Sequence, residues 1–266
     1  MTEEMLKKIK QLPPLPESAM QIERVYQDPN SSFNDMVKIL EKDPLLTADI
    51  LKSANSPLYG FSREITSISQ AVGLFGMGTV RGFALASIVK KSFALDLSIY
   101  GIDADAFALL SKKQHALVTS WCLKINTKIL GILSPAAFLV EIGKALIAQQ
   151  VISDKNEQKF KDMLAQTNSV DNTEKAIAGV DTPEVSASIF EHWKFEQGLV
   201  DTIRYCNNPN DAPSEVTQLA KILHVVREAV LLNGTITDDS MKKAKDLVIQ
   251  YGLDIDSFEK ALQNAL

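Results

Sequence analysis

The chain has 266 residues, of which 45% are hydrophobic and 23% are charged, a composition typical of a globular protein. Its formal net charge of −5 argues against nucleic acid as a partner, because phosphate backbones attract basic surfaces. The two cysteines, Cys122 and Cys206, are far apart and lack C-x-x-C spacing. This excludes a disulfide framework and a zinc ribbon, and it fits a reducing cytoplasm.

Neither a targeting segment nor a membrane partner is expected. Residues 1–10 include two acidic side chains and no apolar core, unlike a signal peptide. The most apolar stretch, residues 129–140, contains Pro135 and runs directly into Glu141. So short an apolar run is more often a buried helix than a membrane span, and we therefore expect a cytoplasmic protein.

Helical periodicity runs through most of the chain. Apolar residues recur at helical spacing, as at Met36, Ile39 and Leu40, and alternating runs joined by hairpin turns are not found. Helix starts are marked by capping residues such as Ser32 with Asp35, and by prolines at first helical positions. These signals predict helices over residues 2–11, 16–27, 32–42, 44–54, 67–75, 78–93, 104–125, 135–150, 154–167, 172–178, 183–193, 196–206, 214–232, 238–250 and 256–265.

The predicted fold class is all-α, with a boundary between two helical blocks. Residues 97–103 include Gly101 and separate the blocks, so we predict an N-terminal helical subdomain over 1–98 and a second over 99–266. The glycines from Gly76 to Gly82 resemble a dinucleotide-binding loop, but their spacing is one residue too long and no strand precedes them. We expect a helix break there and no bound cofactor.

Candidate catalytic side chains are few and scattered. The three histidines, His115, His192 and His224, can form a base or a metal site only if the fold gathers them; otherwise they are capping or half-buried helix residues. A G-x-S-x-G nucleophile sequence is missing, and neither cysteine lies in a recognisable active-site sequence. Taken alone, these residues predict no catalytic centre.

One set of motifs is more specific. It comprises LPPLP at 12–16, DPLLT at 43–47 and LKSANSPLYG at 51–60, continued by Ile65, Ser67, Ala71, Gly76 and Arg81. In order and spacing this set resembles the HDOD domain, an output module of bacterial signalling proteins related to HD-type metal phosphohydrolases. The resemblance extends over about residues 11–212. It implies an HD-domain-like, phosphodiesterase-like helical bundle with an N-terminal helical subdomain.

The resemblance also implies where a metal site would lie. His115 falls at the first metal histidine of the HD superfamily, and residues 139–144 fall on its His-Asp-x-Gly-Lys element, so Val140 and Glu141 stand at the dyad. The resemblance also places Thr182 where the superfamily has a further histidine, and residues 206–207 near the position of a histidine pair. The resulting degenerate pocket comprises His115, Val140, Glu141, Lys144, Asp181 and Thr182.

Valine cannot coordinate a metal. A four-ligand zinc site binds with about 10–16 kcal/mol, so the loss of two ligands weakens binding by about four powers of ten. We therefore expect no metal and a non-catalytic regulatory module that binds a protein partner in signalling, or a small ligand. The alternative is a divergent metal-dependent phosphohydrolase of cyclic dinucleotides or nucleotides, which would use His115, Glu141 and Asp181.

The first half of the resemblance supplies a second candidate site. Pro57 pushes the preceding residue out of the helical region, and a glycine at position 60 permits a positive φ. Tyr59 needs a partner for its hydroxyl, and Arg81 is a donor fork for carbonyls or carboxylates. These residues either brace the loop or form a ligand- or partner-binding face: Asn55, Ser56, Tyr59, Gly60 and Arg81.

Overall fold

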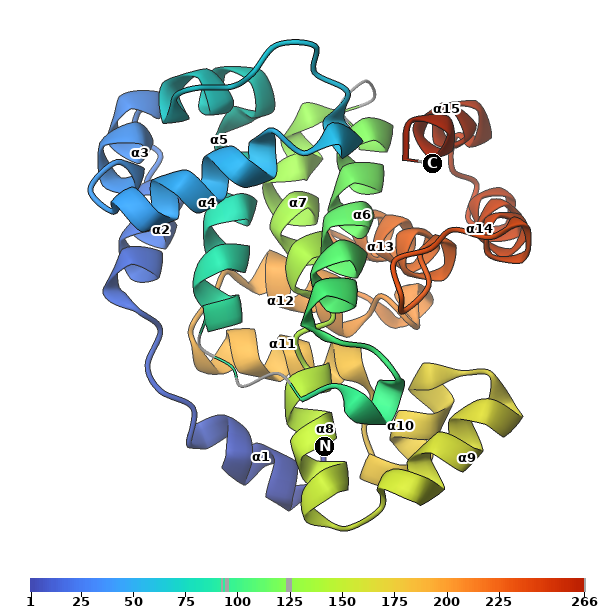
Figure 1. Cartoon of the computed structure of the whole chain (residues 1–266). Coiled ribbons are helices and arrows are strands. Elements are labelled where there is room, and N and C mark those ends of the chain that lie inside the picture. Colours follow the sequence, from blue (N-terminus) through green and yellow to red (C-terminus); the bar gives the residue numbers. More distant parts are fainter. Residues whose placement is uncertain (92, 94–95, 123–125, 266) are drawn as a thin grey trace.

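The computed structural model describes residues 1–91, 93, 96–122 and 126–265, and every regular element within them is a helix (Figure 1). The all-α prediction is confirmed. Helices α6 and α7 stand side by side at the centre of the molecule, with α2–α5 against one side of them and α13–α15 against the other (Figure 1).

The N-terminal half begins with five α-helices and a short 3₁₀ helix. Ser32 forms a capping box with Asp35, as the sequence predicts. The Asp43 carboxylate caps α4 by accepting hydrogen bonds from the two backbone N–H groups that follow Pro44, the first helical residue. The elements are α1 (Glu3–Lys10), α2 (Glu17–Gln27), α3 (Phe33–Leu40), α4 (Pro44–Ala54), η1 (Pro57–Tyr59) and α5 (Ile68–Lys91).

The expected break in the glycine segment is present inside α5. Gly76 has a φ of 79° and a ψ of 163°, which interrupts the helix at a conformation that favours glycine. The expected ends of two predicted helices, at residue 92 and at residues 123–125, lie outside the described residues.

The second half contains ten α-helices among the described residues. They are α6 (Ala104–Cys122), α7 (Leu130–Leu139), α8 (Lys144–Ser153), α9 (Glu157–Thr167), α10 (Val170–Ala178), α11 (Thr182–His192), α12 (Gln197–Arg204), α13 (Thr217–Ala229), α14 (Asp238–Gln250) and α15 (Ile255–Ala265), with 3₁₀ helices η2 (Ser98–Tyr100), η3 (Thr127–Ile129) and η4 (Pro209–Asp211).

The prediction of one helix over residues 135–150 is wrong. Pro135 lies inside α7 rather than at its start, and a turn at residues 140–143 separates α7 from α8. Proline has no N–H to donate to the carbonyl four residues earlier, and that carbonyl, Gly131 O, accepts a hydrogen bond from Arg81 Nη1 at 3.1 Å instead. A tertiary contact therefore satisfies the backbone group that the proline leaves free.

A single apolar core runs through both halves of the chain. The predicted boundary at residues 98–99 falls at η2, and the division into two subdomains remains a prediction. The stretches Ile68–Lys91 and Leu130–Ser153 are long and apolar enough to cross a membrane, but 61% and 94% of their most apolar windows are buried. Most of each window therefore lies inside the protein, packed against other helices.

Helices α5 and α7 approach closely where two glycines meet. A Cβ on Gly78 would lie 2.6 Å from Gly131 Cα, so we expect Gly78→Ala to lower the free energy of unfolding by about 1–3 kcal/mol. Gly73 in the same helix is exposed and has open space around it, so Gly73→Ala should raise the free energy by up to about 1 kcal/mol. Urea unfolding measures both changes, and equal effects of the two substitutions would contradict this packing.

Candidate functional site: a buried ionic cluster

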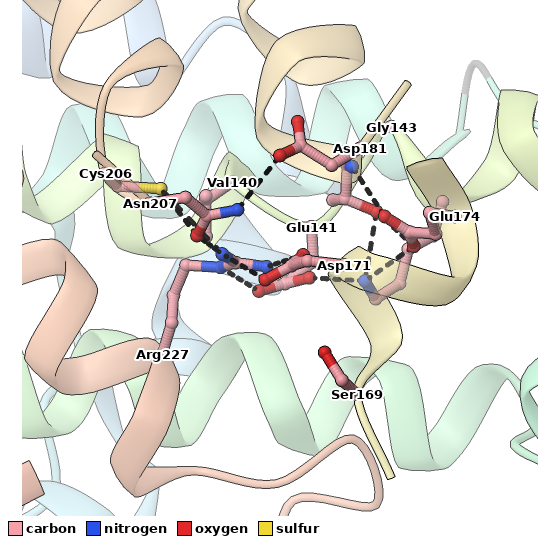
Figure 2. A network of polar contacts seen from close by, with 12 residues as sticks. Val140, Glu141, Gly143, Ser169, Asp171, Glu174, Asp181, Cys206, Asn207 and Arg227 are labelled. Atoms are coloured by element: carbon pink, nitrogen blue, oxygen red, sulfur yellow. Dashed lines mark hydrogen bonds and ion pairs between the residues drawn. The ribbon is translucent and has the colours of Figure 1, made fainter. Parts of the chain in front are cut away.

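Glu141 lies in the turn that follows α7 and is almost completely buried. One of its carboxylate oxygens, Oε1, accepts hydrogen bonds from Arg227 Nε at 2.8 Å and from Gln114 Nε2 at 3.2 Å. The other, Oε2, lies 2.9 Å from Lys144 Nζ. Three helices, α6, α8 and α13, thus direct polar side chains at one carboxylate. Figure 2 shows Arg227 beside Glu141 and Asp171.

Arg227 is the larger of the two cations in this cluster. Its guanidinium also contacts Asp171, with Nη2 3.2 Å from Oδ1, and donates to the side-chain oxygen of Asn207. Burial by itself would raise the pKa of Glu141, but the positive charges of Arg227 and Lys144 outweigh it and hold this pKa well below its usual range. Glu141 is therefore a permanently ionised carboxylate.

Lys144 connects Glu141 to a second buried carboxylate. Its Nζ lies 3.2 Å from Glu174 Oε1 and donates to Thr182 Oγ1 at 3.0 Å. Glu174 in turn accepts from the hydroxyls of Thr182 at 2.6 Å and Tyr100 at 2.9 Å. Burial opposes the charge on Lys144, but the two glutamates prevail and raise its pKa. Lys144 is thus a fixed cation within the fold.

Asp181 lies at the edge of the same network. One carboxylate oxygen, Oδ2, lies 2.9 Å from Lys175 Nζ and accepts from Asn207 Nδ2 at 3.1 Å. The other accepts from the backbone N–H of Glu184 and caps α11. Through these contacts and those of Arg227, one network connects four of the predicted pocket residues, Glu141, Lys144, Asp181 and Thr182.

The donor set does not fit a divalent metal. At the position of the dyad histidine the Val140 side chain is apolar, and its backbone carbonyl accepts a hydrogen bond from Ser186 Oγ at 2.6 Å. Glu141 is already engaged by two cations. Across the part of the chain that the structure describes, no three His, Cys, Asp or Glu side chains are grouped to hold a metal ion. Arg227 and Lys144 supply the positive charge that the carboxylate requires.

His115 does not join this cluster. Its Nδ1 shares a hydrogen bond of 2.5 Å with the Tyr59 hydroxyl, its Nε2 contacts Ser134 Oγ at 2.7 Å, and its ring stacks on Phe138 at 3.9 Å. The contacts therefore place His115 apart from Glu141, whereas the sequence analysis expects the two to share a pocket. Its neighbour Gln114 faces Glu141 instead, because adjacent residues on an α-helix point about 100° apart.

The loop residues after α4 brace the structure. Asn55 donates to the carbonyls of Leu51 and Ile65 and accepts from the Ile65 N–H at 2.8 Å, which fixes the loop to the start of α5. Gly60 ends η1 with a φ of 66°. Ser56 precedes η1 in an extended conformation and is half-buried. These contacts match the bracing interpretation, which the sequence left open beside a binding face.

Arg81 is also a brace, fully buried between four elements. Its guanidinium forms a bidentate pair with Glu23 at 2.6 and 2.7 Å and contacts Glu196 Oε1 at 2.6 Å. It also lies 4.2 Å from the centre of the Tyr26 ring. All these partners lie within the protein and support the bracing interpretation of Arg81, whereas its place on a binding face stays a prediction.

The sequence gives little signal for the other members of the cluster. Gln114 is one residue from the histidine that the resemblance marks, and Asp171, Glu174 and Arg227 carry no motif. Arg227 is 86 positions from Glu141, so only folding brings the two together.

A cavity of about 490 Å³ opens beside the cluster, with Gln114, Glu141, Lys144 and Arg227 in its wall. Gln114 donates to Glu141, but its Oε1 is buried and has no hydrogen-bond partner among the described residues. The volume is typical of small-molecule sites, and a ligand with an N–H or O–H group would satisfy this oxygen.

Comparison with known proteins identifies the class of protein. The family model of the HDOD domain matches residues 12–209, so the chain belongs to the HDOD family. One similar solved structure is a Campylobacter jejuni protein called a virulence factor, which is 26% identical with a TM-score of 0.58. The match covers 99% of this chain and 100% of that chain. A Shewanella amazonensis protein called "Putative phosphohydrolase" is 24% identical over 99% of this chain and 94% of its own, with a TM-score of 0.69.

An uncharacterized protein of Treponema pallidum is 22% identical over 223 residues, which cover 80% of this chain. The chain spans 40% of the length of that relative.

The Arg227 pairing can be tested by its contribution to stability. Arg227→Met would leave the buried Glu141 and the half-buried Asp171 without their main cation, and we expect a loss of about 3–5 kcal/mol in the free energy of unfolding. Glu141→Gln in the same chain should restore part of the loss. As a control, Arg204→Met breaks the more exposed pairs with Glu184 and Glu191 and should cost at most about 1 kcal/mol. Equal losses at both arginines would contradict a buried centre.

Burial lowers the pKa of His115 to about 3. An unfolded histidine titrates near 6.5, so the unfolded chain binds a proton that the folded chain excludes between these values. Stability therefore falls as the pH falls through this window. Between pH 7 and pH 5 the wild-type chain should lose about 2 kcal/mol more than His115→Gln, measured by urea unfolding at each pH. Parallel pH profiles would show that His115 is accessible to protons.

Proposed function

We propose that this chain is a non-catalytic regulatory module that acts by binding, within a bacterial signalling system. The observation that carries the proposal is the engagement of Glu141, the single acidic residue at the dyad position, by Arg227 and Lys144. A metal ion at this position would have to displace both cations and would gain no ligand from Val140. Without a metal ion, an HD-type hydrolase has no activated water.

The rival function, a divergent phosphohydrolase, requires His115, Glu141 and Asp181 to act together. These residues have separate partners: Tyr59 and Ser134 for the histidine, and Lys175 and Asn207 for the aspartate. Burial also holds the imidazole of His115 neutral, with a pKa of about 3, and surrounds it with aromatic rings. This arrangement favours a structural role for each residue over shared metal binding.

Membership of the HDOD family supports a role in signalling, since the family resembles output modules of bacterial signalling proteins. The proposed partner is another protein of the signalling system, with a small ligand as a second input through the cavity beside Gln114. We propose a cytoplasmic location, without nucleic acid or membrane as a partner.

Metal content and hydrolysis test the proposal together. After incubation with Mn²⁺, Fe²⁺ or Zn²⁺ and dialysis, we expect fewer than about 0.1 ions per chain, because missing ligands weaken binding by several powers of ten. Hydrolysis of bis-p-nitrophenyl phosphate and of a cyclic dinucleotide should be no faster than in the Asp181→Asn variant. One ion per chain that is lost in Asp181→Asn, or turnover that the variant lacks, would establish the hydrolase instead.

A further inference from the structure

A second cavity, of about 420 Å³, lies between α4, the end of α5, α6 and the end of α7. Its residues on α6 include Ala108 and Lys112, which lie at least about 120° around that helix from Gln114, the residue that faces the ionic cluster. Much of its wall is apolar and buried, formed by Phe83, Val89, Phe107, Phe138, Leu139 and Ile142.

The rim of this cavity is strongly basic in an otherwise acidic chain. Four lysines line it, Lys52, Lys90, Lys91 and Lys112, against one acidic residue, Asp49. Asp49 is already paired: its Oδ2 lies 2.8 Å from Lys91 Nζ and accepts from Ser87 Oγ at 2.6 Å. None of the other three lysines forms an ion pair with a residue that the structure describes.

The three unpaired lysines also act on one another. Partial burial lowers the pKa of Lys112, and the positive charges of Lys52 and Lys90 lower it further. Asp105 acts in the opposite direction on the pKa of Lys112, and Lys52 also interacts with Asp49, so the protein compensates this positive charge only in part. A bound anion would relieve the remaining repulsion.

We propose that this cavity binds a small organic anion, with its apolar body against the phenylalanine rings and its acidic group among Lys52, Lys90 and Lys112. The volume lies within the usual range for small-molecule sites, and the apolar floor with a few charged groups is their usual composition. An inorganic ion would use the lysines but not the floor, and a neutral apolar molecule would use the floor but not the lysines.

This site does not include the ionic cluster, so the inference goes beyond the proposed function and is tested separately from it. Its floor reaches the centre of the fold, because the rings of Phe83 and Phe138 lie 5.1 Å and 3.9 Å from the ring of His115. Phe83 also contacts Tyr59, with ring centres 5.8 Å apart. An occupant of the cavity would therefore contact the aromatic group that joins the 51–60 loop to α6.

Fluorescence titration with 1-anilinonaphthalene-8-sulfonate, an anion with an apolar body, tests the proposal on the whole chain. The wild-type chain should bind the probe saturably. The triple variant Lys52→Gln, Lys90→Gln, Lys112→Gln should bind at least about tenfold more weakly, since it loses three attractive charges. Ala108→Phe keeps the lysines but fills space at the cavity wall, and should weaken binding similarly.

The matched control is Lys7→Gln, Lys159→Gln, Lys242→Gln, which removes the same charge from exposed positions elsewhere and should change affinity by less than about twofold. Circular dichroism verifies that each variant is folded. Decanoate and 1-naphthyl phosphate serve as carboxylate and phosphate competitors, and the better of the two identifies the acidic group. Decanol and inorganic phosphate should both compete poorly.

Equal weakening in the control variant, or no saturable binding at all, would overturn the proposal. So would competition by decanol or by inorganic phosphate as strong as that of decanoate and 1-naphthyl phosphate. None of these variants changes Glu141, Lys144 or Arg227. A negative result for the anion site would therefore not count against the proposed non-catalytic function. Failure of that function would likewise leave this site in place.

Discussion

A carboxylate removed from water must be compensated, and in this protein that requirement is concentrated at Glu141. Removing one such charge from water costs several kcal/mol unless cations and hydrogen bonds replace the lost solvation. Lys144 and Arg227 supply both, and they come from α8 and α13. A single acidic group in the turn after α7 thus determines how separate helices pack. It also draws α13, which lies beyond the residues matched by the family model, into the centre of the fold.

The same cluster shows how buried carboxylates can be compensated by side chains of the chain itself. A metal ion in such a site would neutralise acidic ligands, and the guanidinium and ammonium groups perform that neutralisation here with fixed side chains. Because these cations are fixed side chains, the charge of Glu141 is compensated within the fold. A cavity with polar groups in its wall lies beside the cluster.

Helix α6 carries two different environments on two faces. Gln114 faces the ionic cluster, whereas His115 lies among Tyr59, Phe83 and Phe138. Sequence motifs identify the helix and the histidine, but a shift of one residue turns a side chain by about 100°, from one environment to the other. This is why the fold class and the family could be predicted from the sequence while the composition of the site could not. The same limit on prediction applies to three other members of the cluster, because charged residues of these types are usually found on protein surfaces: Asp171, Glu174 and Arg227.

Local chemistry in the sequence determined most of the helices, the caps at Ser32 and Asp43 and the break at Gly76, because each depends on residues within a few positions of one another. The sequence also determined that position 140, where the resemblance implies a metal-binding histidine, is a valine. Tertiary structure alone decided that Pro135 lies within a helix. The carbonyl of Gly131, to which the proline cannot donate, accepts a hydrogen bond from Arg81, 50 positions away in the sequence. It likewise decided which cations surround Glu141, because the pairing of buried charges depends on distances that only the packed helices define.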